Sequence, residues 1–150
     1  MNPENIFTPA VQSLVETSIK AAESHTSCEL RVHIEDECAG DPLDRAAFIF
    51  AELGMHNTAL RNGILIYVAL ESRKTAILGD AGINQHAEPG YWDHIRDAML
   101  AQFMSGKYPE GIVTAVELVG KKMKEHFPVQ DGDVNELPNS ISFRQNNRTS

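Results

Sequence analysis

Hydrophobic positions follow helical spacing in some stretches of the chain and strand spacing in others, and their order predicts an alternating α/β protein. Apolar residues recur at three- and four-residue steps in the helical stretches. They alternate with polar residues, or form an unbroken run, in the strand stretches. The predicted elements are a helix over 8–22, a strand over 28–34, a helix over 41–53, strands over 63–70 and 73–79, and helices over 91–103 and 109–126.

The pairing of the predicted strands follows from their connections. Residues 63–70 form a continuous aliphatic run, which is typical of a central strand buried on both faces. The short connection to 73–79 requires an antiparallel hairpin. A helix joins 28–34 to 63–70, so we expect these two strands to be parallel with a right-handed crossover. Helices should cover both faces, which predicts a three-layer α/β/α sandwich with a small mixed sheet.

The size and charge of the chain narrow the functional classes. A chain of 150 residues with 42% hydrophobic residues is the size of one soluble domain. It has 13 basic against 21 acidic residues, a net charge of −8. Such a molecule repels phosphate backbones and anionic lipids and attracts cations, so we expect no nucleic-acid partner and no membrane partner.

The N-terminal residues and the two cysteines indicate the cellular location of the protein. The N-terminus lacks the basic and apolar regions of a signal peptide, and no apolar run is long enough to span a bilayer. Cys28 and Cys38 are separated by a predicted strand, which places them too far apart for a disulfide. We therefore expect a cytoplasmic protein.

Most catalytic motifs that could be recognised by spacing are missing from the sequence. It contains neither the Gly-x4-Gly-Lys-Ser/Thr loop of nucleotide-binding proteins nor the Gly-x-Ser-x-Gly elbow of α/β hydrolases. Arg45 follows Cys38 one residue too late for the Cys-x5-Arg loop of cysteine phosphatases. The sequence therefore identifies no nucleophile, and the catalytic residues stay unassigned.

One group of oxygen-bearing side chains is predicted to meet at one end of the sheet. The hairpin brings Asp80 beside Asn62, the following loop carries Asn84 past the same end, and Asp93 lies in the first turn of the next helix. Carboxylate, amide and backbone oxygens are the ligands that Ca²⁺ prefers. The alternative is that Asp93 complements the helix dipole and Asp80 caps a turn.

A second acidic pair, Asp41 and Asp44, follows the first predicted strand. It should lie at the end of the sheet opposite Asp80, where helix capping is its expected role.

The same segments carry a family resemblance. The chain resembles the TPM domain over roughly residues 8–138. The stretches that carry the resemblance are Arg61-Asn62-Gly63-Ile64-Leu65-Ile66-Tyr67-Val68-Ala69, Arg73-Lys74, Gly79-Asp80-Ala81-Gly82-Ile83-Asn84, Tyr91-Trp92-Asp93, Phe103-x-x-Gly106-x-Tyr108-x-x-Gly111-Ile112 and the closing segment from Phe127-Pro128 to Asp133-Val134-Asn135-Glu136-Leu137-Pro138. We therefore expect a TPM-like domain over 1–138 and a disordered polar tail over 139–150.

The resemblance has implications for fold and function. It implies a Rossmann-like sandwich, in agreement with the fold predicted from the residues. Some family members are reported to bind calcium, and a plant member has been described as an acid phosphatase. The positions that match are Asn62, Asp80, Asn84 and Asp93. Arg61 stands where many relatives carry an acidic residue, and a cation at this position weakens ion binding.

Two binding functions, and a pure scaffold with no ligand as a third possibility, are consistent with the sequence. The first is a domain that binds a divalent cation, Ca²⁺, through Asp80, Asp93, Asn62 and Asn84, with metal-dependent phosphatase activity as a possible extension. The second is a non-catalytic interaction module that holds a protein partner through its acidic surface.

Overall fold

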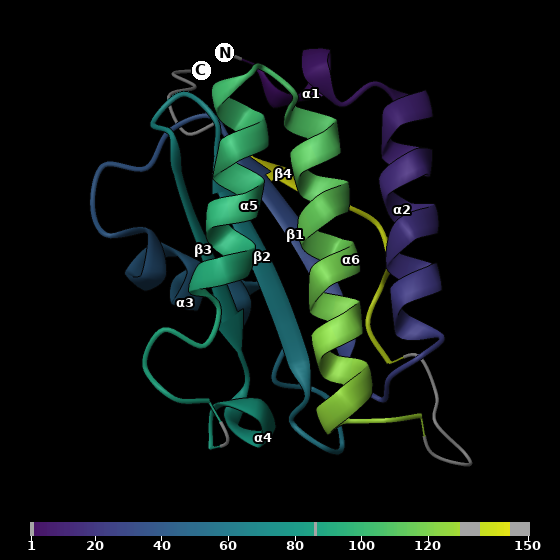
Figure 1. Cartoon of the computed structure of the whole chain (residues 1–150). Coiled ribbons are helices and arrows are strands. Elements are labelled where there is room, and N and C mark those ends of the chain that lie inside the picture. Colours follow the sequence, from purple (N-terminus) through teal and green to yellow (C-terminus); the bar gives the residue numbers. More distant parts are fainter. Residues whose placement is uncertain (1, 86, 130–135, 145–150) are drawn as a thin grey trace.

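Helices cover both faces of a mixed β-sheet (Figure 1). The computed structural model describes residues 2–85, 87–129 and 136–144. The elements are, in chain order, α1 (Pro3–Ile6), α2 (Pro9–Glu23), β1 (Glu29–Glu35), α3 (Pro42–Glu52), β2 (Gly63–Ala69), β3 (Lys74–Gly79), α4 (Ala81–Asn84), α5 (Asp93–Met104), α6 (Tyr108–His126) and β4 (Ser142–Arg144).

The sheet has the order β3-β2-β1-β4, which leaves β3 at one edge. β1 and β2 run parallel, with Leu30 opposite Ile64. β2 and β3 form an antiparallel hairpin, with Leu65 opposite Leu78. Both predicted pairings are therefore confirmed, and so is the predicted α/β sandwich.

α2 and α3, which both have a proline in the first turn, start where the sequence predicts. The side chain of Thr8 accepts a hydrogen bond from the N–H of Val11 at the start of α2. Asp41 does the same for the N–H of Leu43 at the start of α3. A proline occupies the first turn of each helix, where its missing N–H leaves no intrahelical bond unmade.

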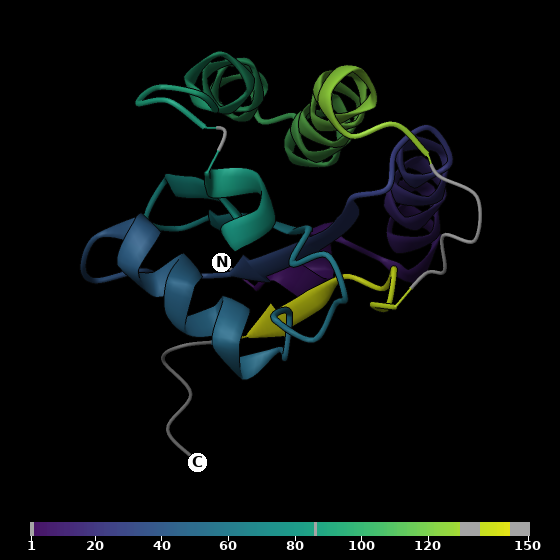
Figure 2. The same cartoon turned by 90° about the horizontal axis from the view of Figure 1, so that it is seen from below.

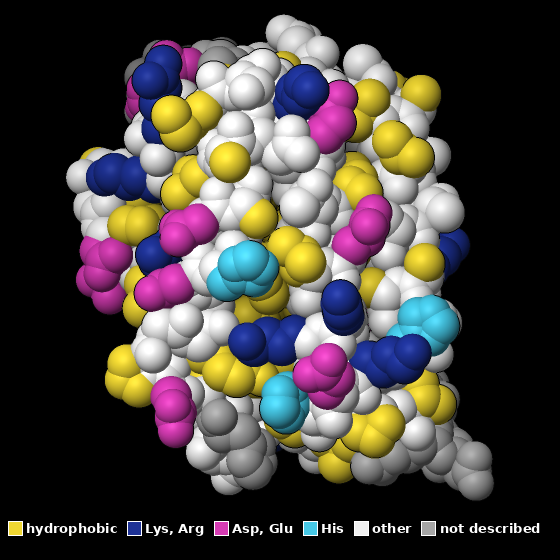
Figure 3. All heavy atoms as spheres, viewed as in Figure 1, with side chains coloured by type: hydrophobic (Ala, Val, Ile, Leu, Met, Phe, Trp, Pro, Cys, Tyr) yellow, Lys and Arg dark blue, Asp and Glu magenta, His cyan; other side chains and the backbone are white. Residues whose placement is uncertain are grey.

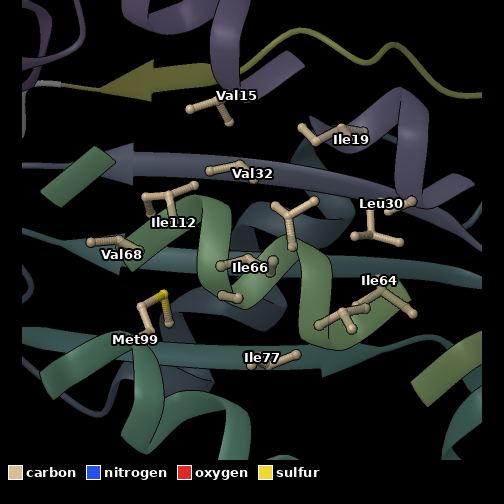
Figure 4. Close-up of a cluster of buried hydrophobic side chains, with 14 of the residues drawn as sticks. Val15, Ile19, Leu30, Val32, Ile64, Ile66, Val68, Ile77, Met99 and Ile112 are labelled. Carbon is tan, nitrogen blue, oxygen red and sulfur yellow. The ribbon is translucent and has the colours of Figure 1, made fainter. Parts of the chain in front are cut away.

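Each face of the sheet packs against its own helices. Figure 2 shows α2, α5 and α6 on one side of the sheet and α3 on the other. On the three-helix side, Val32, Ile66 and Ile77 pack with helical residues such as Met99 (Figure 4). On the other side, Phe50 of α3 belongs to a second core that contains alternate residues of β2 and β3. Strand residues therefore alternate between two cores, as their spacing requires.

The segment expected to be a tail contains a short strand. β4 pairs in parallel with β1, and Ser142 lies opposite His33. The side chain of Ile141 is buried, and the Phe143 ring lies 6.2 Å from that of Phe7. These long-range contacts hold a three-residue strand whose own pattern is too short to be recognised. Residues 145–150 of the expected tail lie outside the described residues.

Within the described part of the chain, no helix combines the length and the apolar character needed to cross a membrane. The cytoplasmic location stays a prediction.

Candidate functional site

Asp80 lies where the sequence places it, directly after β3 and beside the start of β2. Its N–H donates to the carbonyl oxygen of Gly63 at 2.9 Å. Its carboxylate caps α4 by accepting a 2.7 Å hydrogen bond from the N–H of Ala81. The residue is only 4% exposed, so the carboxylate needs partners to remain ionised.

Arg61 is the main partner of the Asp80 carboxylate. Its Nε donates to Oδ2 of Asp80 at 2.7 Å and its Nη2 donates to Oδ1 at 2.8 Å. His56 Nδ1 lies 3.1 Å from Oδ1. Burial raises the pKa of Asp80, but the hydrogen bonds, above all those from Arg61, outweigh it and hold the pKa below its usual value. A cation at Asp80 would therefore have to displace the guanidinium group.

Asn62 lies close to Asp80 along the hairpin but is engaged differently. Its side-chain Nδ2 donates to the carbonyl oxygen of Ser27, and its backbone N–H donates to Oγ1 of Thr58. Its Oδ1 is buried and has no hydrogen-bond partner within the described residues. The amide therefore ties β2 to the segment before β1, with one acceptor left over.

Asp93 and Asn84 line a surface groove that Asp80 does not line. The Asp93 side chain is 56% exposed and pairs with Arg96 at 3.2 Å. Asn84 keeps a backbone contact to the Asp80 corner, because its N–H donates to the carbonyl oxygen of Asp80 at 2.9 Å. The structure thus groups Asp80 with Arg61, and Asp93 with the groove. Over the residues that the structure describes, no three His, Cys, Asp or Glu side chains are arranged to hold a metal ion.

The groove runs along the outer edge of β3 and has a volume of about 510 Å³. Its floor is formed by 75–78. One wall is the start of α3, where Asp41 lies, and the other is the segment from α4 to the start of α5, which carries Glu88. Lys74 fixes the first wall, because its Nζ donates to the carbonyl oxygens of Cys38 and Gly40 at 3.0 and 2.8 Å.

Both walls of the groove are acidic. Asp41, Glu88 and Asp93 contribute carboxylates, whereas Arg96 is the one basic side chain among the described lining residues. The sequence predicts Asp41 at the end of the sheet opposite Asp80 and Asp93 at the Asp80 end, so it does not predict a groove lined by both. In addition, α3, which begins after Asp41, and α5, which begins at Asp93, lie on opposite faces of the sheet (Figure 2). The edge position of β3 brings these two faces together.

A buried ionic cluster lies at the C-terminal end of β1, and the sequence did not predict it. Glu35 is fully buried, and Arg45 donates to it twice, at 3.1 and 2.7 Å. The Tyr67 hydroxyl also donates to Glu35, and His33 Nε2 lies 3.1 Å from it. His33 Nδ1 in turn lies 2.7 Å from Oγ of Ser142 on β4. Burial raises the pKa of Glu35, but the surrounding hydrogen bonds outweigh it and hold the pKa far below its usual value.

Comparison with known proteins identifies the family. The model of the TPM domain matches residues 1–122, which is most of the chain. The chain belongs to the TPM domain family. The resemblance that rests on the hairpin and glycine motifs is thereby confirmed.

Solved structures agree with this assignment. This TPM domain is 40% identical to the BA42 protein from the psychrophilic bacterium Bizionia argentinensis, with a TM-score of 0.84 over 91% of this chain and 94% of that chain. The N-terminal domain of a protein from P. gingivalis is 21% identical, with a TM-score of 0.65 over 80% of this chain and 78% of that one. The N-terminal domain of the cg2496 protein from Corynebacterium glutamicum is 13% identical, with a TM-score of 0.60 over 89% and 78% of the two chains. The last two show the shared fold only. No curated protein matched the chain.

Proposed function

We propose that this TPM domain is a protein-interaction module that binds a basic segment of a partner in the groove along β3. The observation that carries the proposal is the position of three carboxylates, Asp41, Glu88 and Asp93, on the two walls of one groove. A groove lined by one sign of charge attracts and orients a ligand of the opposite sign.

The distribution of charge on the surface supports this choice of groove. Figure 3 shows the face covered by α5, α6 and α2, where acidic and basic side chains are interspersed. Neither positive nor negative charge therefore dominates that face. The walls of the groove, with one guanidinium against three carboxylates, are more selective for a cationic ligand.

The geometry favours binding over the phosphatase reaction considered from the sequence. That reaction would use Asp80 or Asp93 to orient an attacking water at a shared metal. Asp80 is instead paired with Arg61, and Asp93 lies in the groove with Arg96. The two carboxylates would have to leave these partners to act together.

Calcium binding is a second candidate for the same groove. It is favoured by the oxygen-bearing side chains of Asp93 and Asn84, two of the four predicted ligands, which line the groove together with Asp41 and Glu88. Calorimetric titration with Ca²⁺ tests it: heat of binding that is lost in Asp93→Asn supports a site here, and no heat at millimolar Ca²⁺ rejects it.

The interaction proposal is tested with a fluorescein-labelled peptide that carries an adjacent Lys-Arg pair between valines and threonines. Anisotropy should report saturable binding to the wild-type protein. The double variant Glu88→Gln/Asp93→Asn should bind about tenfold more weakly, because two attractive charges are lost.

A matched control separates groove binding from general attraction to an acidic protein. Glu117→Gln/Glu125→Gln removes the same charge from two exposed positions of α6. It should change affinity by less than about twofold. Equal weakening in both double variants, or no binding to the wild type, would reject the proposal.

A further inference from the structure

The outer edge of β3 has backbone groups that form no hydrogen bond to any other residue described by the structure. β3 is the end strand of the sheet (Figure 1), and its single partner is β2. The hydrogen bond from Asp80 N–H to the Gly63 carbonyl oxygen sets which residues bond across this antiparallel ladder. Because bonded positions alternate, Ala76 and Leu78 bond to β2, whereas the N–H and C=O groups of Thr75 and Ile77 point outward.

Thr75 and Ile77, which carry these outward groups, line the groove. Among the residues that the structure describes, no side chain or backbone group makes a hydrogen bond to the N–H or C=O of Thr75 or Ile77. Both residues are nevertheless only 6% exposed. Backbone polar groups in such a setting are nearly always paired, so the edge is suited to accept a further hydrogen-bonding chain.

The sequence of β3 does not protect this edge. Proteins commonly guard an exposed edge strand with a charged residue or a proline in its middle. The run Thr75-Ala76-Ile77-Leu78 contains neither. Instead, the two walls of the groove restrict access to the edge of β3. The edge therefore lies at the bottom of a narrow groove and is not an open strand.

We infer that the partner segment binds as an added β-strand on the outer edge of β3. This inference rests on the proposed interaction function and specifies the conformation of the bound segment. Residues 75–78 span about 13 Å of strand, which matches an extended segment of four or five residues. Its backbone pairs with the N–H and C=O groups of Thr75 and Ile77.

The two walls then specify the sequence of the segment. Successive side chains of an added strand point to opposite faces of the sheet. One face leads to Asp41 at the start of α3, and the other leads to Glu88 and Asp93 before and within α5. A segment with two adjacent basic residues therefore places one cation against each wall.

A second copy of this chain is disfavoured as the occupant. Pairing of two β3 edges would bring the carboxylates of Asp41, Glu88 and Asp93 in one copy toward those in the other. Like charges that meet across an interface oppose association. The charge of the groove thus selects a basic segment from a different protein.

The decisive experiment uses two backbone-methylated forms of the labelled Lys-Arg peptide. In one form every second backbone amide flanking the basic pair carries an N-methyl group. In the other form the intervening amides carry the N-methyl groups. An added strand turns one set of amides toward β3 and the other set toward solvent. One methylated peptide should lose at least about tenfold in affinity, since it loses hydrogen bonds and clashes with β3, while the other should stay within about twofold of the parent.

The remaining outcomes separate the inference from the proposed function. Binding of the parent peptide with the same affinity for both methylated forms, or equal losses in both, would overturn strand addition and leave the interaction function in place. Failure of the parent peptide to bind would overturn both. Sedimentation equilibrium adds one more outcome: a concentration-dependent dimer that the peptide dissociates would overturn the choice of occupant in favour of a second copy.

Discussion

Replacing Glu35 with glutamine should destabilise the fold strongly, because this carboxylate is the centre of the buried cluster at the end of β1. Its side chain is fully buried, whereas that of its main partner, Arg45, is 25% exposed. Glu35→Gln preserves the shape of the side chain but removes the negative charge. It leaves the guanidinium of Arg45 without an anion beside the Tyr67 hydroxyl and the His33 ring.

The expected loss of stability is about 3 kcal/mol. Removing one partner of a buried ion pair typically costs about 3–5 kcal/mol, and the partial exposure of Arg45 favours the lower end. At about 2–4 °C for each kcal/mol in a domain of this size, the melting temperature should fall by roughly 10 °C.

The pH dependence of the free energy of unfolding is a second way to measure the effect of Glu35→Gln. The pKa of Glu35 is lower in the folded protein than its usual value of 4.5. Its contribution is therefore fully present above that value and is lost as the pH falls toward the folded pKa. As the pH falls below 4.5, the free energy of unfolding should therefore decrease less steeply for Glu35→Gln than for the wild type.

Urea denaturation of four proteins tests this reasoning: wild type, Glu35→Gln, Arg45→Met and the double variant. The double variant should be less destabilised than the sum of the single ones, by more than about 1 kcal/mol. Glu52→Gln is the matched control, because Glu52 also pairs with an arginine but its side chain is 38% exposed, and it should lose less than about 1 kcal/mol. A loss for Glu35→Gln as small as that for Glu52→Gln would refute the account of the cluster.

Three further predictions concern other parts of the fold. Burial, and secondarily the nearby Glu29, raise the pKa of Glu23 to about 7, so stability should fall as the pH rises from 4.5 to 7. Glu23→Gln should remove about 3 kcal/mol of that fall in denaturation measurements at pH 5 and pH 8, and an unchanged difference would contradict it. A methyl group on Gly82 would collide with the Leu60 carbonyl oxygen, so Gly82→Ala should cost about 1–3 kcal/mol in urea, and a neutral effect would disprove the close packing of α4. Burial raises the pKa of Cys28 to about 11, so iodoacetamide at pH 8 should leave it intact in the folded protein, whereas rapid alkylation seen by mass spectrometry would argue against its burial.

Elements with a strong local pattern could be predicted from the sequence. The hairpin of β2 and β3 follows from two apolar runs and a short turn, and the start of α3 follows from Asp41 and the proline after it. β4 could not be predicted, because three residues show no periodicity and its stability comes from contacts with β1 and α1.

The candidate site was predictable only where it depends on the hairpin. The hairpin correctly places Asp80 beside the start of β2. The orientation of Arg61 could not be foreseen, since its backbone has a φ of 51°, which a non-glycine residue rarely adopts. The groove depends on how the segment between α4 and α5 passes the edge of β3, and no local spacing encodes that path.

Amide hydrogen exchange, followed by NMR, tests most directly whether the edge of β3 binds a basic strand. In the free protein, the amides of Thr75 and Ile77 should exchange much faster than those of Ala76 and Leu78, which bond to β2. With saturating Lys-Arg peptide, exchange at Thr75 and Ile77 should slow by at least about tenfold, while Ala76 and Leu78 change little. Unchanged exchange at Thr75 and Ile77 in the saturated complex would contradict the account.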